Sequence, residues 1–344
     1  MNFKSYELKE FRESKGLLID VRSPDEYYKG HMPNSINIPL FNNEERSIVG
    51  KDYKVNGKET ATIKGLNIVE AKLDNLISEF VLAEKNYFNK HLNNFKIYCA
   101  RGGMRSQSIF WLLNKLNYST ILLSGGYKQY RRKVLDNFNK NIKIKLIGGK
   151  TGSGKTKILN ILKNNNYQII DLEYLANHRG STFGSLGMDE QPTNEQFENL
   201  IEDELYKFDL NKEIFIEAES ANIGRCRIPY ELFKRMKDSP RIEIKKCEKD
   251  RINELVKTYS VYPKEELIDS IIRIKKRLGP QRTELAIKSV KNEKWDNVCK
   301  AVLDYYDKCY DYELEGKENV KTLDLSGVNE KSIIELMIKN GLII

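Results

Sequence analysis

Short apolar runs alternate with longer segments of helical periodicity in the first part of the chain. Residues 17–21, 95–98 and 120–123 are apolar runs of strand length. Between them, residues 66–82 and 106–116 carry apolar side chains at a spacing of three to four, which is typical of helices. Strands that alternate with helices predict an α/β domain built on a mostly parallel sheet.

The same alternation resumes after a polar stretch at residues 139–141, where we place a domain boundary. We therefore expect one domain over residues 1–138 and a second over residues 139–344. Strands of the second domain are predicted at 142–147, 167–171, 213–217, 241–244 and 322–325. Residues 250–312 are chiefly helical in pattern, and a last helix is expected at 330–340. The second domain is thus α/β with a helical C-terminal part.

Length and composition agree with a two-domain globular protein. The chain has 344 residues, of which 40% are hydrophobic and 31% charged. No apolar run approaches the roughly 18 residues that a membrane-spanning helix needs, and the N-terminus lacks the apolar stretch of a signal peptide. The five cysteines form no CxxC pair, which argues against a disulfide framework or a zinc site. We expect a cytoplasmic protein without membrane contact or tightly bound cofactor, and Mg²⁺ is the one metal ion that the sequence leaves open.

The formal net charge of +9 favours a polyanionic partner, because each neutralised phosphate releases counterions. A solvated lysine-rich surface would give the same charge. The basic residues gather in three clusters: Lys128, Arg131, Arg132 and Lys133; Lys234, Arg235 and Lys237; and Arg273, Lys275, Lys276 and Arg277.

Cys99 opens a loop between a predicted strand and a predicted helix. Gly102 and Gly103 allow the backbone amides to face inward, and Arg101 and Arg105 add positive charge. Inward amides and a helix N-terminus favour a bound oxyanion and the thiolate form of a cysteine. The loop therefore predicts Cys99 as a catalytic nucleophile, with Arg101 and Arg105 beside it and Gly102 and Gly103 in the anion cradle.

The surroundings of this loop resemble the rhodanese family. The likeness is carried by Asp20, Val21, Arg22, Glu26, Tyr27, residues 30–39 and residues 125–127. In rhodaneses the loop cysteine carries a persulfide or its selenium analogue as a transferable group. His31 precedes a proline turn in this motif, so we expect it to be structural. The spacing from Cys99 to Arg105 also matches the CxxxxxR loop of cysteine phosphatases, and the local pattern leaves that alternative open.

Residues 149–156 match the P-loop pattern GxxxxGK[ST] at every fixed position. The segment follows a strand of branched residues and opens a helix, which is the context that the motif needs. Backbone amides would wrap a phosphate, Lys155 would reach its terminal oxygens, and the Thr156 hydroxyl would serve a magnesium ion. The predicted phosphate-binding residues are Gly149, Gly152, Ser153, Gly154, Lys155 and Thr156.

Acidic and polar residues follow the next strands of the second domain. Because ligands bind at the carboxyl ends of strands in open α/β sheets, we expect them to line one crevice with the P-loop. Glutamates stand where a Walker-B aspartate is usual, which leaves nucleotide hydrolysis open; the loop would equally hold a diphosphate. The expected crevice residues are Asp171, Glu173, His178, Arg179, Glu217 and Glu219.

The order of the two domains resembles the tRNA 2-selenouridine synthase family over nearly the whole chain. The specific pieces are residues 42–50, the cysteine loop, 148–156, 171–184 and 217–224. The resemblance implies action on 2-thiouridine at the wobble position of tRNA, whose sulfur is alkylated from geranyl diphosphate and then replaced using selenophosphate. It implies that Cys99 accepts or guides selenium, that Arg101 and Arg105 hold the phosphate of selenophosphate, and that the P-loop grips a diphosphate.

The same resemblance implies two partners, the anticodon loop of tRNA and an enzyme that produces selenophosphate. Splayed bases of an anticodon loop are commonly held on aromatic rings, and Tyr127 and Tyr130 are candidates for that contact. Two other classes compete: a P-loop kinase fused to a sulfurtransferase or cysteine phosphatase that acts on a small molecule, and a non-catalytic RNA-binding protein. The intact loops disfavour the last of these.

Overall fold

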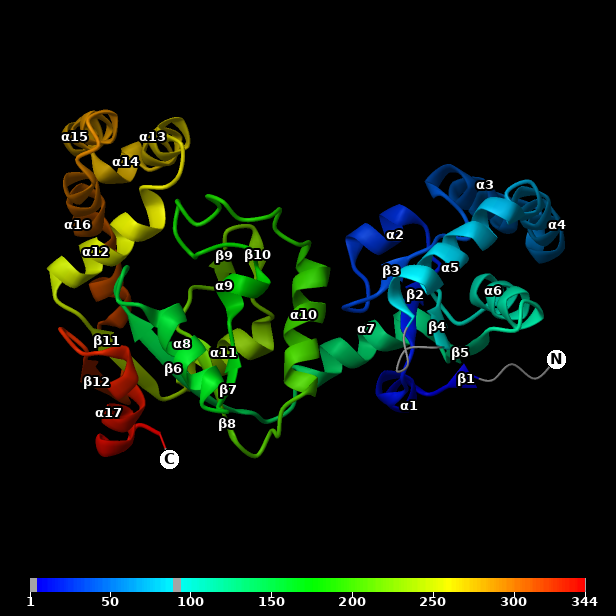
Figure 1. The fold of residues 1–344 in the computed structure, drawn as a ribbon, viewed down its shortest axis with the longest axis horizontal. Coiled ribbons are helices and arrows are strands. Elements are labelled where there is room, and N and C mark those ends of the chain that lie inside the picture. Colours follow the sequence, from blue (N-terminus) through cyan, green and yellow to red (C-terminus); the bar gives the residue numbers. More distant parts are fainter. Residues whose placement is uncertain (1–4, 89–93, 344) are drawn as a thin grey trace. The chain divides into compact units, whose positions relative to one another are not determined.

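The alternating strands and helices build two parallel sheets, one in each of two compact units, Met1–Asn137 and Phe138–Ile344. The computed structural model describes residues 5–88 and 94–343. Figure 1 shows the N-terminal unit from blue to teal and the C-terminal unit from green to red. The expected α/β fold class is confirmed.

The N-terminal sheet has the strand order β1-β5-β4-β2-β3, and every neighbouring pair is parallel. Helices cover both faces of such a sheet, which is why its central strands are continuous apolar runs. The strands are β1 (Ser5–Tyr6), β2 (Leu17–Asp20), β3 (Ile36–Asn37), β4 (Asn94–Tyr98) and β5 (Ser119–Leu123).

Seven helices belong to the described part of the N-terminal unit. They are α1 (Leu8–Glu13), α2 (Pro24–Lys29), α3 (Asn43–Val55), α4 (Gly57–Glu70), α5 (Leu73–Tyr87), α6 (Met104–Lys115) and α7 (Gly126–Asn137). The single helix expected at 66–82 was wrong, since the chain divides there into α4 and α5. Leu66 and Leu82 are exposed, and the buried face of α5 is formed instead by Leu76, Phe80 and Ala83.

The C-terminal sheet has the order β12-β11-β6-β8-β7, again with every pair parallel. A short antiparallel hairpin of β9 and β10 follows β8. The strands are β6 (Lys143–Gly149), β7 (Gln168–Ile170), β8 (Glu213–Glu217), β9 (Asn222–Ile223), β10 (Cys226–Arg227), β11 (Arg241–Lys245) and β12 (Val320–Asp324).

The helices of the C-terminal unit divide into those beside the sheet and a helical group. The first set is α8 (Lys155–Asn164), α9 (Leu172–Leu175), α10 (Asn194–Tyr206), α11 (Tyr230–Asp238), the 3-10 turn η1 (Glu330–Ser332) and α17 (Ile333–Lys339). The helical group is α12 (Glu248–Tyr259), α13 (Lys264–Arg273), α14 (Lys275–Leu278), α15 (Pro280–Lys291) and α16 (Trp295–Leu314). In Figure 1 this group lies at one end of the unit, and its own apolar core includes Phe183, Leu267 and Val302.

Both glycine-rich loops follow the middle strand of their sheet. Cys99 comes directly after β4, and the P-loop begins at the last residue of β6. A loop at this position has the carboxyl ends of neighbouring parallel strands on either side, which is where open α/β sheets bind their ligands. The fold thus prepares one candidate site in each unit.

Candidate active sites

The cysteine loop runs from Cys99 to Gly103 and leads into α6. Gly102 has a φ of 66°, and a Cβ there would lie 2.9 Å from the carbonyl oxygen of Leu123. The start of α7 closes the other side, because the amide of Tyr127 donates to the carbonyl of Cys99 over 2.8 Å. Glycine is therefore required at position 102, and the loop is held against the β5–α7 turn.

The Cys99 side chain lies beneath this loop. Only 3% of the residue is exposed. Its Sγ is 3.2 Å from the hydroxyl oxygen of Ser106, which in turn donates to the carbonyl of Gly103 over 3.1 Å. The structure thus puts the predicted nucleophile at the foot of the loop, with a hydroxyl beside the sulfur.

The two loop arginines have different surroundings. Arg101 is exposed. The Arg105 guanidinium donates to both oxygens of Glu26, over 2.6 and 3.1 Å. Burial alone would raise the pKa of the Glu26 carboxyl, but the hydrogen bonds and charge of Arg105 hold that pKa at about 2. The charge of Arg105 is therefore already balanced in this conformation.

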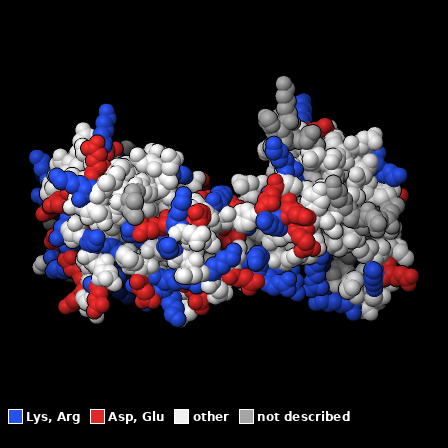
Figure 2. All heavy atoms as spheres, turned by 90° about the horizontal axis from the view of Figure 1, so that it is seen from below, with Lys and Arg blue, Asp and Glu red and all other residues white. Residues whose placement is uncertain are grey.

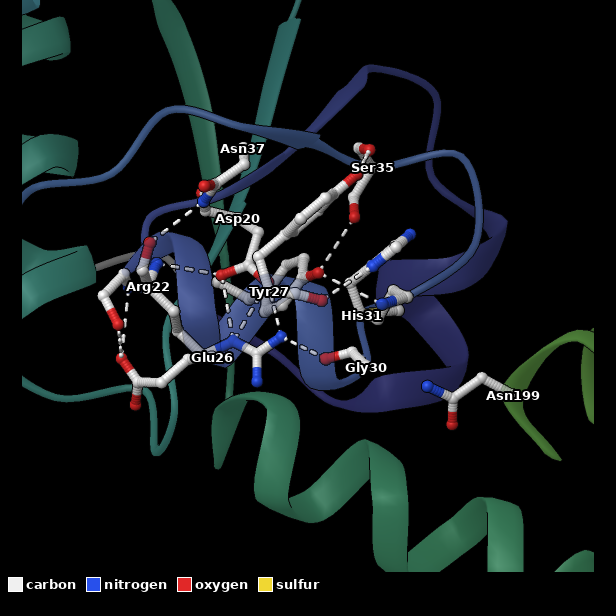
Figure 3. Close-up of polar contacts among 12 residues, drawn as sticks. Asp20, Arg22, Glu26, Tyr27, Gly30, His31, Ser35, Asn37 and Asn199 are labelled. Atoms are coloured by element: carbon white, nitrogen blue, oxygen red, sulfur yellow. Dashed lines mark hydrogen bonds and ion pairs between the residues drawn. The ribbon is translucent and has the colours of Figure 1, made fainter. Parts of the chain in front are cut away.

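A polar network surrounds the turn after α2, as Figure 3 shows. Arg22 donates to Asp20 over 2.6 Å and to the carbonyl of Gly30 over 2.7 Å. His31 stacks on Tyr27 at 3.8 Å, and its Nδ1 lies 2.9 Å from the Tyr27 carbonyl oxygen. These contacts fix the turn after α2, as expected for a structural His31.

Tyr127 and Tyr130 do not fit the role predicted for them in base stacking. They are 6% and 1% exposed. The guanidinium carbon of Arg22 lies 3.7 Å from the centre of the Tyr127 ring, so this ring packs on the buried network. The interpretation was wrong because α7 turns its tyrosines inward and its lysines and arginines outward.

The P-loop joins β6 to α8 through three glycines with positive φ. These are Gly149 (152°), Gly152 (80°) and Gly154 (86°). A Cβ at Gly152 would lie 2.8 Å from the carbonyl oxygen of Arg251, so a larger residue there would collide with α12. Lys155 spans the loop and donates to the carbonyl of Gly149 over 3.0 Å. Its ammonium group is thus held against the backbone of the loop.

Two helices of the helical group brace the P-loop. Arg251 of α12 donates to the carbonyl of Thr151 over 2.9 Å and to Asp307 of α16 over 2.5 and 2.8 Å. Lys150 lies 2.8 Å from Asp311, also on α16. These contacts connect the backbone of the P-loop to α12 and α16.

A crevice of about 2180 Å³, counted with its open side, lies beside the P-loop. Asp171, Glu173, Arg179 and Glu219 line it together with residues 150–157. Asp171 caps α9, and Glu173 lies inside that helix rather than at the strand end where it was predicted. The crevice therefore combines a phosphate-binding loop with several carboxyl groups.

Two of the crevice carboxyls, those of Glu173 and Glu219, hold protons more tightly than usual. Burial, followed by the negative charge of Glu219, raises the pKa of Glu173 to about 7. The pKa of Glu219 is also raised, by burial, which the charge of Lys155 opposes. Thr156 donates to Glu173 over 3.3 Å. A cation or a protonated ligand would relieve the crowding of these charges.

His178 and Glu217, which were predicted to line the crevice, lie behind its wall. Glu217 is fully buried at the end of β8, where its Oε2 accepts from the amide of Leu172 over 2.9 Å. Burial raises the pKa of Glu217 well above its ordinary range. A Cβ at Gly184 would lie 2.8 Å from the His178 ring, so His178 fills the turn that shapes residues 178–184. Both side chains support the crevice from beneath.

Comparison with known proteins now bears on these sites. Residues 142–337 match the model described as tRNA 2-selenouridine synthase AAA domain, and residues 5–133 match the rhodanese-like domain. A tRNA 2-selenouridine synthase of Marinobacter nauticus is 32% identical over 335 residues, covering 88% of this chain and 89% of its own. One of Sulfurovum sp. is 33% identical (87% and 88% covered), and one of Nitrosomonas eutropha 35% (76% and 67%). The chain belongs to the tRNA 2-selenouridine synthase family.

Membership confirms the resemblance noted in the sequence and makes the chain a tRNA-modifying enzyme rather than a non-catalytic RNA-binding protein. The family-specific match extends to residue 337 and so includes α12 to α16. The helical group that braces the P-loop is thus part of the domain that the model describes.

Sequence reasoning missed the residues that α16 brings to the site. Tyr306, Cys309, Tyr310 and Glu313 line the crevice, and the Tyr310 hydroxyl accepts from the amide of Gly149. They lie roughly 150 residues after the P-loop in a segment read only as helical. Their spacing of three to four places them on one face of α16, which is the signal that was present.

Charge on the face of the molecule in Figure 2 is of both signs. Figure 2 shows lysines and arginines interspersed with acidic side chains on the face in view. Lys128, Arg132 and Lys133 on α7 and Lys275, Lys276 and Arg277 on α14 are exposed. Within residues 5–88 and 94–343, no helix has the length and apolarity to cross a bilayer. The same residues contain no group of three His, Cys, Asp or Glu side chains placed to hold a metal ion.

Proposed function

We propose that the chain converts 2-thiouridine at the wobble position of tRNA into 2-selenouridine, through S-geranyl-2-thiouridine. Family membership supports the product. One structural observation supports a route in two steps: the chain has two different strand–glycine loop–helix sites, one with a thiol and one with a phosphate-binding loop beside a large crevice. Alkylation of the sulfur and its replacement by selenium are chemically different steps, and two different sites would provide one for each.

We assign the alkylation to the P-loop crevice. The loop amides and Lys155 would hold the diphosphate of geranyl diphosphate and stabilise the charge that develops on this leaving group. The sulfur of 2-thiouridine forms a bond to C1 of the geranyl group while the C1–O bond breaks and its electron pair leaves with diphosphate. Loss of the N3 proton keeps the base neutral. Alkylation makes the sulfur at C2 a better leaving group.

A magnesium ion fits this step. Thr156 and Glu173 offer a hydroxyl and a carboxylate, which are the hard oxygen donors that Mg²⁺ prefers. Phosphate oxygens of the ligand would complete its coordination. Bound Mg²⁺ would neutralise the charge on the diphosphate.

We assign selenium transfer to the cysteine loop. The backbone amides of residues 100–103, with Arg101 and Arg105, would hold the phosphate of selenophosphate, and the Cys99 thiol would steer its selenium toward the base without forming a bond to it. Selenium attacks C2 of the alkylated base and geranylthiolate leaves. Water then takes the phosphoryl group as the P–Se bond breaks, which releases phosphate. Another enzyme must supply selenophosphate.

The tRNA would meet the exposed basic residues of α7 and α14, since phosphate contacts position a nucleic acid on its protein. With Tyr127 and Tyr130 buried, base stacking needs other rings. Tyr174, which is 70% exposed and lines the P-loop crevice, is the better candidate.

Mass spectrometry of nucleosides tests the proposal. Thiolated tRNA is incubated with the protein and geranyl diphosphate, with selenophosphate, or with both, and unthiolated tRNA serves as the control. We expect S-geranyl-2-thiouridine with the first, unchanged 2-thiouridine with the second and 2-selenouridine with both. Selenouridine formed without geranyl diphosphate would contradict the two-step route, and no modified nucleoside in any mixture would contradict the function.

A further inference from the structure

A second, apolar pocket opens beside the P-loop crevice. It measures about 540 Å³, counted with its open side as the crevice was. Its walls come from the 181–183 turn and from α12, α13 and α16. The lining residues are Thr151, Ser181, Phe183, Leu255, Val256, Tyr259, Ser260, Leu267, Trp295, Val298, Cys299, Val302, Leu303 and Tyr306.

The pocket and the crevice are adjacent. They share five residues: Thr151, Ser181, Leu255, Tyr259 and Tyr306. Thr151 belongs to the P-loop itself, so the pocket begins directly beside the loop that would hold the phosphate of a ligand. The Tyr306 ring is fixed at this junction, because its hydroxyl accepts from the amide of Thr182 over 3.1 Å.

The apolar lining of the pocket favours one kind of ligand over another. Almost all of the accessible wall is carbon, and the Ser181 hydroxyl already accepts from the amide of Phe183 over 3.2 Å. A nucleobase in the pocket would bury ring nitrogens and exocyclic groups without partners, which costs free energy for each one. A hydrocarbon chain carries no such groups and gains from the same burial.

We propose that this pocket binds the isoprenoid chain of the allylic diphosphate whose head group lies on the P-loop, and that its size sets the accepted chain length. The inference rests on the proposed function and deepens it: the prenyl donor is recognised at both ends by the C-terminal unit. The reactive C1 carbon then lies at the junction, beside the rings of Tyr259 and Tyr306. Aromatic faces there stabilise the positive charge that C1 gains as its bond to oxygen breaks.

Calorimetric titration of the full-length chain tests the pocket directly. The probes are inorganic diphosphate, dimethylallyl diphosphate, geranyl diphosphate and ATP. We expect affinity to rise with chain length, with geranyl diphosphate binding at least about tenfold more tightly than inorganic diphosphate. The heat-capacity change should become more negative along the series, as burial of apolar surface requires. ATP should bind no more tightly than inorganic diphosphate.

Two variants locate the effect. Val302→Phe fills the pocket and should bring the affinity for geranyl diphosphate down to that for inorganic diphosphate, which itself stays unchanged. Trp295→Ala enlarges the pocket and should shift the preference toward the fifteen-carbon farnesyl diphosphate. Leu285→Phe adds the same kind of bulk to an exposed position on α15 and should alter nothing.

The outcomes separate this inference from the function on which it rests. If geranyl diphosphate binds no more tightly than inorganic diphosphate, the chain pocket is overturned, while binding of inorganic diphosphate still upholds the P-loop role. A preference for ATP that Val302→Phe removes would make the pocket a base site and would also overturn the inference. If no diphosphate binds at all, both the inference and the proposed alkylation step fail.

Discussion

The two glycine-rich loops occupy equivalent positions in their sheets but differ in how open they are to solvent. Each follows the middle strand of a parallel sheet and leads into a helix. Around Cys99 the loop is tightly packed, the sulfur is covered and Arg105 is paired with Glu26. Around Lys155 the loop faces a wide crevice in which carboxyl groups crowd together. The cysteine loop is thus closed around its own side chains, whereas the P-loop opens on a wide crevice lined by carboxyl groups.

Replacement of Cys99 by alanine should separate the activities of the two loops and have the largest effect of the variants considered. We expect Cys99→Ala to abolish 2-selenouridine formation, because the loop loses its thiol, while S-geranyl-2-thiouridine accumulates, because the crevice is untouched. Nucleoside mass spectrometry reads both products from one digest. Cys226→Ala, which removes a buried cysteine of the C-terminal unit, is the matched control. Wild-type selenouridine from the Cys99 variant would refute the role of the loop.

The second-largest expected effect is on the pH dependence of stability, and it comes from the crowded carboxyls of the P-loop crevice. A Glu173 pKa of about 7 lies above the usual 4.5, so the folded state binds the proton more tightly than the unfolded state. Its contribution to stability is complete below pH 4.5 and is lost as the pH rises through 7. For a shift of this size the loss approaches about 3 kcal/mol.

Glu173→Gln should remove that part of the pH dependence. We expect the free energy of unfolding of the variant, measured in urea between pH 5 and 8.5, to fall less steeply with pH than that of the wild type. The raised pKa values of Glu217 and Glu219 leave a residual slope in both proteins. Glu318→Gln, at an exposed position, should retain the wild-type slope.

Removal of the P-loop lysine tests whether the wider of the two sites holds the diphosphate. Lys155→Ala should weaken binding of geranyl diphosphate by about 10- to 100-fold, since a charge-assisted hydrogen bond is worth roughly 1.5–3 kcal/mol. Lys207→Ala, at the C-cap of α10 and paired with Asp203 and Glu204, serves as the control. Equal affinities of the Lys155 variant and the wild type would show that the diphosphate is held elsewhere.

The ion pair of the cysteine loop has the smallest expected effect. The pKa of Glu26, about 2, lies below its usual value, so its contribution to stability is present above pH 4.5 and is lost as the pH falls toward 2. Because the Glu26 side chain is 28% exposed, we expect about 1 kcal/mol. Glu26→Gln should flatten the acid side of the stability profile. An unchanged acid limb would show that the pair contributes nothing to folding.

How much the sequence could predict depended on the range of the interactions involved. Local patterns were sufficient for the α/β class and for the position of both loops, since strand, glycines and helix are contiguous in each. Local patterns failed for Glu217, because burial of a strand end depends on the neighbouring strands. They failed for Tyr127 as well, whose partner Arg22 is a hundred residues away. Tyr306 and Tyr310 could not be placed, since only tertiary packing brings α16 to the P-loop.

One face of α12 has a consequence for how a ligand is bound. Arg251 holds the phosphate-loop backbone, and Leu255 and Tyr259, one and two turns further, line both the crevice and the apolar pocket. The helix α12 therefore contacts both the region proposed for the polar head of the ligand and the region proposed for its hydrocarbon tail. Thermodynamic reciprocity then requires that tail occupancy strengthen phosphate affinity by the same factor as phosphate occupancy strengthens tail affinity.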